Sequence, residues 1–206
     1  MAASEIAGIL LAAGSSTRFG GDKLLHPLPD GTPVAVAAGR SLLAAVPRAC
    51  AVVRPGDGRL AAALAALGLA IVENPQAVSG MGTSLAAGVR ATREADGWII
   101  ALADMPWIRS GTIASLADGL REGASMIAPA HRGRRGHPVG FSSRWHHELC
   151  QLTGDRGARG LLTAHAELLE VLESDDPGIN RDIDYRDEIP QAEDARLAGP
   201  DKLSRS

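Results

Sequence analysis

Residues 10–23 read LLAAGSSTRFGGDK, and this stretch determines how the chain begins to fold. The apolar run of residues 6–12 is short and is followed by Gly14, which is typical of a buried strand in a parallel sheet. The segment after it is rich in Gly, Ser and Thr and contains Arg18 and Lys23. We expect a loop at the carboxyl end of that strand, where small residues let backbone N–H groups approach an anion. A Gly-rich turn with solvated basic residues is the plain alternative.

Apolar runs alternate with helical segments at short spacing through the first 130 residues. The pattern predicts strands over 6–12, 49–53, 69–73, 98–103, 125–129, 139–141 and 168–173, and helices over 33–46, 60–67, 83–94, 113–120, 143–152 and 158–165. Such alternation indicates an α/β fold, with a doubly wound, mostly parallel sheet and helices on both faces. Ligands of such sheets bind beyond the carboxyl ends of the strands.

The composition narrows the class of protein. The chain has 206 residues, of which 45% are hydrophobic, and we expect a single domain over 1–190 followed by a flexible polar tail over 191–206. A net charge of −3 gives no sign of a nucleic-acid or membrane-surface partner. Two cysteines are too few for a disulfide framework. The first residues resemble neither a signal peptide nor a membrane span, so a cytoplasmic location is expected.

The sequence lacks two familiar nucleotide-binding motifs and a recognisable set of zinc ligands. Walker A requires an adjacent Gly-Lys pair, but Asp22 separates Gly21 from Lys23. The dinucleotide pattern GxGxxG fails as well, because two serines follow Gly14. The histidines at 146–147 are neighbours that face different directions on a helix, and no third ligand follows, which argues against zinc.

The order of residues in LAAGSSTRFGGDKLL resembles the signature loop of nucleotidyltransferases that make nucleotide sugars, cytidyl-erythritol and molybdenum-cofactor dinucleotides. Further segments are similar to the same family in the same order: SGMGTSLAAGV (79–89), ALADMP (101–106), GHPVGF (136–141), GDRGARGLL (154–162) and DID (182–184). Together they resemble the molybdenum cofactor cytidylyltransferase type within that superfamily. The resemblance covers residues 6 to about 189 and implies a Rossmann-like fold.

The resemblance implies that CMP from CTP is joined to the phosphate of molybdopterin cofactor, with release of pyrophosphate. A phosphate monoester is already anionic near neutral pH, so the reaction needs charge neutralisation and in-line alignment rather than a general base. Arg18 and Lys23 fit the departing pyrophosphate. Asp104, with Asp184 or Asp182, would hold one Mg²⁺. A molybdenum hydroxylase or its maturation factor is the implied recipient of the product.

The resemblance also assigns the binding residues. The expected nucleotide site comprises Leu11, Ala12, Ala13, Gly14, Arg18, Lys23, Gly80, Met81 and Ser84, and the expected acceptor site comprises Arg135, His137 and Pro138. The LAAG form of the loop favours CTP over GTP. Plainer interpretations exist: Asp104 caps a turn before proline, and Asp182 and Asp184 are charges near a helix N-terminus. HRGRRGH is either a solvated hairpin tip or, next to GHPVGF, a clamp for the acceptor phosphate; GHPVGF and GDRGARGLL resemble the acceptor-side segments of the family.

Two departures from the family pattern leave the acceptor most open. The segment ALADMP has Met where relatives often carry Gln, and DIDYRDEI replaces the more usual DIDTPED. The alternatives are the same chemistry with GTP, or on a sugar 1-phosphate, methylerythritol phosphate or phospholactate. A non-catalytic carrier of the molybdenum cofactor is a third, and Arg18, Lys23, Asp104 and Asp184 argue against it, because a carrier does not need the metal carboxylates.

Overall fold

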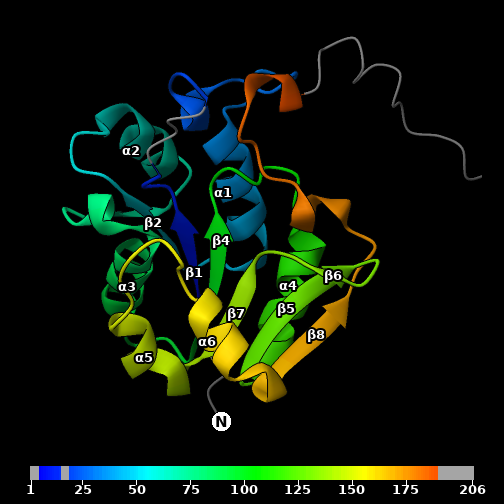
Figure 1. The fold of residues 1–206 in the computed structure, drawn as a ribbon. Helices are drawn as coiled ribbons and strands as arrows, with labels where there is room; N and C mark the ends of the chain where they lie inside the picture. The colour runs from blue at the N-terminus through cyan, green and yellow to red at the C-terminus, as the bar shows by residue number, and fades with distance from the viewer. Residues whose placement is uncertain (1–4, 15–18, 190–206) are drawn as a thin grey trace, which may run out of the picture.

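The computed structural model describes residues 5–14 and 19–189, so Arg18 and the predicted tail at 191–206 lie outside the described residues. The predicted α/β fold is confirmed: the described residues form an eight-stranded, mostly parallel sheet with helices on both faces (Figure 1). The strands are β1 Ile6–Leu11, β2 Ala49–Val53, β3 Ala70–Glu73, β4 Gly97–Leu102, β5 Met126–His131, β6 Arg134–Arg135, β7 Val139–Ser142 and β8 Leu169–Glu173.

The strand order is β3-β2-β1-β4-β7-β5-β6, with β8 paired to the other edge of β5. β1 lies at the centre of the parallel part, between β2 and β4. Its last residue, Leu11, is in register with Leu102 of β4, and the backbone N–H of Ala103 donates to the carbonyl of Leu11 over 3.1 Å. The loops that follow β1 and β4 therefore leave the sheet side by side.

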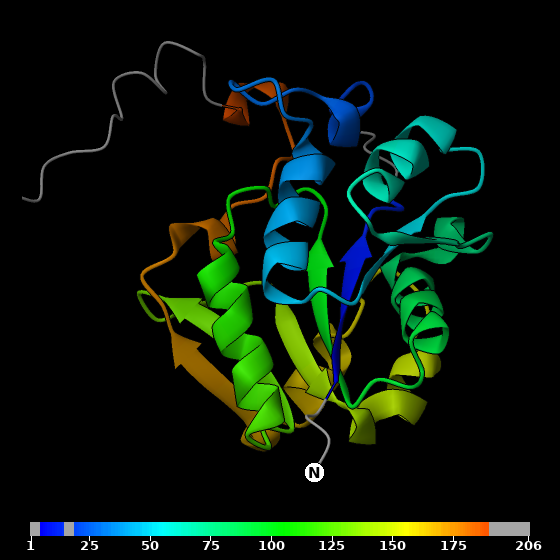
Figure 2. The ribbon, with the colours of Figure 1, turned by 180° about the vertical axis from the view of Figure 1, so that it is seen from behind.

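The helices cover the sheet in two layers. They are α1 Val34–Ala45, α2 Gly58–Ala65, α3 Met81–Ala91, α4 Ser110–Arg121, α5 His146–Cys150 and α6 Arg159–Ala164. α3, α5 and α6 lie on the face seen in Figure 1, whereas α1, α2 and α4 lie on the face seen in Figure 2. None of the helices in the described part is long and apolar enough to cross a membrane.

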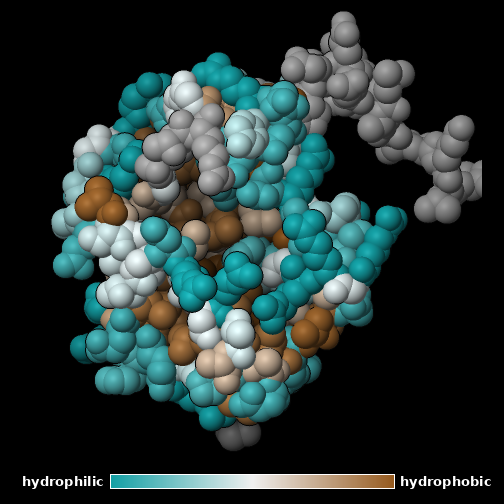
Figure 3. Space-filling view, in the orientation of Figure 1, coloured by the Kyte–Doolittle hydropathy of each residue, from teal (hydrophilic) through white to brown (hydrophobic). Residues whose placement is uncertain are grey.

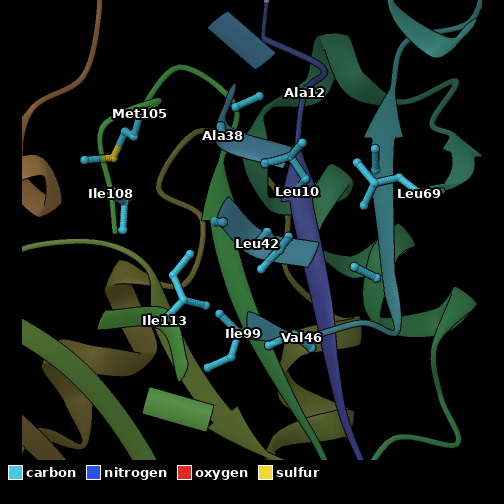
Figure 4. Packing of buried hydrophobic residues seen from close by; sticks show 14 of the residues in the cluster. Leu10, Ala12, Ala38, Leu42, Val46, Leu69, Ile99, Met105, Ile108 and Ile113 are labelled. Atoms are coloured by element: carbon cyan, nitrogen blue, oxygen red, sulfur yellow. The ribbon is translucent and has the colours of Figure 1, made fainter. Parts of the chain in front are cut away.

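The protein has one hydrophobic core on each face of the sheet, and successive residues of the central strands point alternately into one core and the other. Leu10 of β1 packs with Leu42 of α1 and Ile99 of β4 on one face (Figure 4). Ile9 and Leu11 point to the other face and join a second cluster with residues of α3 and α6. Successive strand residues face opposite sides of a sheet, so a strand buried on both faces is apolar at every position, as β1 is.

Several boundaries differ from the sequence predictions. The helix predicted over 143–152 is a 3₁₀ turn, Ser143–Trp145, followed by the short α5. The helix predicted from residue 83 begins at Met81, directly after Gly80, whose positive φ of 108° ends the preceding turn. The segment HRGRRGH forms a hairpin that joins β5 to the two-residue β6, which is compatible with both a solvated tip and an acceptor-phosphate clamp.

A C-terminal strap, residues 181–189, returns to the loop that follows β1 (Figure 1). Ile183 and Ile189 of the strap form a small apolar cluster with Phe19 and Val34. The guanidinium of Arg186 lies 5.2 Å from the centre of the Phe19 ring, and its Nε donates to the Phe19 carbonyl over 3.4 Å. The strap thereby connects two segments more than 160 residues apart in sequence.

Candidate active site

A buried lysine and two carboxylates meet at the carboxyl edge of the sheet. Lys23 is only 7% exposed, and its Nζ donates to Oδ2 of Asp104 over 2.8 Å. The same Nζ lies 3.6 Å from Oδ1 of Asp184. A buried ammonium group requires such compensation, because an unpaired charge out of water is very costly.

Three separate segments bring these groups together. Lys23 opens a short 3₁₀ turn, Lys23–Leu25. Asp104 follows β4, and Asp184 belongs to the C-terminal strap. The strap is tied to the Asp104 segment by its backbone, because the N–H of Ile183 donates to the carbonyl of Asp104 over 3.0 Å.

The two carboxylates at this point are a donor set that could hold part of the shell of a divalent cation. Both Asp104 and Asp184 approach the same ammonium group, so their carboxylates face a common centre. Mg²⁺ is commonly held by one or two carboxylates, with water and substrate phosphate oxygens completing its shell. Among the described residues no group of three or more His, Cys, Asp or Glu side chains is arranged to hold a metal, so substrate oxygens would have to supply the remaining ligands.

A cavity of about 350 Å³ opens beside Lys23 and Asp104. Figure 3 shows the molecule hollowed on this face, with apolar surface at the bottom of the hollow. Eight residues singled out in the sequence line it: Leu11, Ala13, Gly14, Lys23, Gly80, Met81, Ser84 and Asp104. Five further lining residues were not foreseen: Leu24, Ala77, Val78, Leu102 and Asp155.

Two expected binding residues do not line this cavity or its neighbour. Ala12 is 1% exposed and packs in the core on the α1 side of the sheet. Pro138 is buried and forms a cis peptide bond with His137. The residues next to them in the chain do line the cavities: Ala13, which follows Ala12, lines the first, and His137, which precedes Pro138, lines the second.

A buried polar network fixes the wall formed by the start of α3. The side-chain amide of Asn74 donates to Thr83 Oγ1 over 2.9 Å and to Ser84 Oγ over 3.0 Å. The Thr83 hydroxyl donates in turn to the carbonyl of Gly80 over 2.9 Å. Asn74 directly follows β3, and the sequence analysis missed it, although an Asn after a strand end is the available signal.

Two loops join at the far wall of the cavity. The N–H of Gly82 donates to the carbonyl of Gly154 over 2.8 Å, and the N–H of Gly154 donates to the carbonyl of Ser79 over 3.1 Å. A Cβ on Gly82 would lie 2.7 Å from the backbone of Thr153, so only glycine permits this approach. The segments 79–82 and 153–155 therefore act as one wall.

A second cavity of about 570 Å³ adjoins the first, and both are lined by Leu11, Met81, Leu102 and Asp155. Arg135 and His137, two expected acceptor residues, line it. Three more arginines that were not assigned also line it, Arg134, Arg156 and Arg159. Its floor is apolar, with Leu85, Ile100, Val139, Ala158 and Leu162.

His137 presents an unusual polar group beside the second cavity. Its Nδ1 is buried and has no hydrogen-bond partner among the described residues. Burial lowers the pKa of the His137 imidazole below its ordinary value, against the opposing charges of Asp104 and Asp182. The lowered pKa favours the neutral imidazole near pH 7, and His137 as a whole lines the second cavity.

Joined cavities of this kind, with cations and carboxylates beside the first, suit an enzyme that transfers a nucleotidyl group. Residues 8–168 match the MobA-like NTP transferase domain. The match covers most of the chain, and the protein belongs to this family of nucleotidyltransferases.

Several solved structures share the fold of this chain. Rv0371c from Mycobacterium tuberculosis H37Rv has a TM-score of 0.77 and 27% identity, covering 91% of this chain and 96% of that one. A structure of Rv0371c is a manganese complex, which supports a divalent-cation requirement in the family. A nucleotidyl transferase from Methanothermobacter thermautotroptrophicus shares the fold, with a TM-score of 0.74 and 22% identity over 89% of this chain and 94% of its own.

A curated relative carries a different kind of name. Nicotine blue oxidoreductase of Paenarthrobacter nicotinovorans is 29% identical over 188 residues, which are 87% of this chain and 92% of the relative. Family membership therefore establishes the domain, and the particular substrates have to be argued from the cavities.

Proposed function

We propose that the enzyme transfers CMP from CTP to the phosphate of molybdopterin cofactor and releases pyrophosphate. The observation that carries this proposal is the junction of the two cavities. They share Leu11, Met81, Leu102 and Asp155, and the first is lined by Lys23 and Asp104. Two bound substrates would thus meet beside a cation and carboxylates.

The reaction requires little covalent chemistry from the protein. An oxygen of the acceptor phosphate attacks the α-phosphorus of CTP, and the bond from that phosphorus to the bridging oxygen breaks as pyrophosphate leaves. Lys23 neutralises phosphate charge in the first cavity, and Arg18 is proposed to do so for the departing group. Mg²⁺ held by Asp104 and Asp184 would neutralise further charge on the phosphates. Fixed charges of this kind stabilise the transition state without reorganisation.

The first cavity favours a pyrimidine. Ala13 lines it and is 9% exposed, so its methyl group limits how closely a base approaches the backbone. The opposite wall, at Gly80, Met81 and Ser84, is held by the Asn74 network. The LAAG form of the first loop is the sequence feature that supports CTP rather than GTP.

The second cavity suits a phosphate-bearing heterocycle. Its apolar floor takes a flat ring system, and its arginines take anionic groups. The neutral imidazole of His137 offers a hydrogen bond to a polar ring or phosphate atom. A molybdenum hydroxylase or its maturation factor is the proposed recipient of the dinucleotide product.

Pyrophosphate release with each nucleoside triphosphate, with and without molybdopterin cofactor, tests the proposal. We expect release only with both substrates, and kcat/KM for CTP on the order of 10² above that for GTP, since each unpaired buried polar group costs about 1–3 kcal/mol. Ala13→Gly should narrow this ratio without inverting it.

Other results of these assays would change the proposed nucleotide or the proposed acceptor. A preference for GTP would defeat cytidylyl transfer and leave nucleotidyl transfer in place. Release with a sugar 1-phosphate, methylerythritol phosphate or phospholactate, and none with molybdopterin, would replace the acceptor. Because one relative is named nicotine blue oxidoreductase, redox conversion of nicotine blue should be assayed in parallel through its absorbance, and no turnover is expected.

A further inference from the structure

The second cavity contains more positive charge than one phosphate requires. Arg134 and Arg135 come from the β5–β6 hairpin, whereas Arg156 and Arg159 come from the segment that begins α6. Asp155 is the one carboxylate among the described residues that line the cavity. Four guanidinium groups in one cavity repel each other unless an anion compensates them.

The position of these four arginines, rather than their lack of partners, sets them apart. Arg48, Arg54, Arg93, Arg109 and Arg121 each pair with a carboxylate at 2.7 to 3.1 Å. Within residues 5–14 and 19–189, none of the four cavity arginines makes an ion pair, and the same holds for other exposed arginines such as Arg40 and Arg59. All four line one cavity, however, so their combined charge is available to an anion bound there.

The four arginines fall into two pairs. Arg134 and Arg135 line the second cavity, whereas the other two line a further hollow as well. Arg156 and Arg159 also line a third, open hollow of about 480 Å³ with Gly160, Thr163 and Ala164. The third hollow shares no residue with the first, which contains Lys23 and Asp104. Arg156 and Arg159 therefore connect the second cavity to a hollow that is not lined by Lys23 or Asp104.

We propose that Arg156 and Arg159 bind a second oxyanionic group of the acceptor, at the end remote from its reacting phosphate. This rests on the proposed function in one respect: the reacting phosphate must lie where the first two cavities meet. A single phosphate at that junction would leave the remote arginine pair uncompensated. The apolar floor between the two ends accommodates the body of the ligand, so the acceptor is anionic at both ends and flat or apolar between them.

The chemistry of arginine narrows the second group to an oxyanion. A guanidinium presents a planar fork of N–H donors that matches two oxygens of a carboxylate, phosphate or metal oxyanion. A simple sugar 1-phosphate carries one anionic group and otherwise hydroxyl groups, so it would not satisfy two such forks at its remote end. The inference therefore separates this acceptor class from neutral sugar phosphates.

The test is a double variant, Arg156→Gln/Arg159→Gln, against the matched control Arg93→Gln/Arg121→Gln, which removes the same charge elsewhere on the surface. With molybdopterin cofactor as acceptor, we expect KM for the acceptor to rise at least about tenfold, since hydrogen bonds to charged groups are worth about that much or more. KM for CTP and kcat should stay within about twofold of the unaltered enzyme. The control should match the unaltered enzyme in all three.

A binding measurement keeps this inference separate from the proposed function. Inorganic sulfate is titrated calorimetrically into enzyme saturated with a non-hydrolysable CTP analogue, so that the first cavity is filled. We expect sulfate affinity to fall at least about tenfold in the double variant and to be unchanged in the control. Unchanged sulfate affinity, or an equal loss in the control, overturns the inference. Absence of pyrophosphate release from the unaltered enzyme would instead count against molybdopterin as the acceptor.

Discussion

Lys23 is stable in its buried position because Asp104 and Asp184 compensate its charge. Removing one member of such a group leaves an unbalanced charge in a poorly solvated place, which is more costly than losing the attraction itself. Lys23 and Asp104 also line the first cavity, and Asp184 lies 3.6 Å from the Lys23 ammonium group. Substitutions here should therefore affect nucleotide use and stability together, so both have to be measured for each variant.

Asp104→Asn keeps the shape of the side chain and removes its charge. We expect pyrophosphate release to fall by about 10²–10³, because a fixed electrostatic partner of the reacting group is lost. The fold should remain, as measured by circular dichroism. Asp118→Asn, which alters an exposed carboxylate paired with Arg121, is the matched control and should leave the rate unchanged. Near-normal turnover in a folded Asp104→Asn enzyme would show that Asp104 has another role.

Lys23→Ala tests the cation itself. It removes the positive charge between Asp104 and Asp184, so both nucleotide affinity and stability should fall, and urea unfolding should be measured beside the steady-state rates. Arg18→Ala and Arg18→Lys should both weaken use of the triphosphate, the latter because a point charge cannot replace a two-pronged donor. If all three variants bind and turn over nucleotide normally, the opening loop is only a turn.

The residue types at the site followed from the sequence, but their pairing did not. The family motifs pointed to Lys23, Asp104 and Asp184, and to most of the residues lining the first cavity. The contacts of Lys23 with Asp104 and Asp184 form only when the Lys23–Leu25 turn and the C-terminal strap both pack against the end of β4. A local sequence pattern does not encode such long-range packing. Arg134, Arg156 and Arg159 lay inside quoted motifs and went unassigned, because charge alone does not tell a solvated arginine from one facing a cavity.

At the scale of elements, the two joined loops determine how the substrates affect each other. Segment 79–82 lines the first cavity, segment 153–155 reaches the second through Asp155, and two backbone hydrogen bonds connect them. Any displacement of one loop moves the other. Both substrates should consequently respond to a change confined to this contact.

Gly82→Ala places a methyl group against the Thr153 backbone, at 2.7 Å before adjustment. The backbone has to separate, because neither side can turn a flexible side chain aside. We expect KM to rise for both CTP and the acceptor, roughly tenfold or more, measured by initial-rate kinetics. Gly111→Ala, where nothing lies within 4 Å of the added carbon, is the control. A rise in only one of the two KM values would show that the loops act independently.

The elements themselves were largely predictable from the periodicity of apolar residues. Continuous apolar runs bounded by Gly or Pro indicated the parallel strands, and their observed bounds agree to within one or two residues. The position of β7 did not follow, because an antiparallel strand between β4 and β5 is decided by long-range pairing. The split of the helix at 143–152 likewise depends on tertiary packing of Trp145 and Leu149.

At the scale of the whole molecule, the strap fastens the last described residues to the first loop. Its apolar cluster is small, with Phe19, Val34, Ile183 and Ile189. Arg186 adds a cation–π contact and a hydrogen bond to Phe19. These contacts add to the hydrogen bond from the Ile183 N–H to the Asp104 carbonyl in positioning Asp184, and we expect that weakening them affects turnover before it affects the fold.

Arg186→Ala removes both contacts to Phe19. We expect kcat to fall roughly threefold to tenfold, in line with a contact worth about 1 kcal/mol, while the unfolding midpoint in urea changes little. Arg121→Ala, in an exposed ion pair on α4, is the comparison and should leave kcat unaltered. An unaltered kcat in Arg186→Ala would mean that the apolar cluster, the Ile183–Asp104 backbone hydrogen bond and the Arg181–Trp107 contact hold the strap without Arg186.

The strap also has a consequence for synthesis on the ribosome. Domains generally fold from the N-terminus as the chain emerges, and a nascent chain that has passed β8 already contains every described strand and the residues of both cavity floors. It still lacks Ile183 and Asp184. On the proposed assignment of Asp184, we expect such an unfinished chain to bind a nucleotide without transferring it until residues 183–184 have emerged and folded against the Asp104 segment.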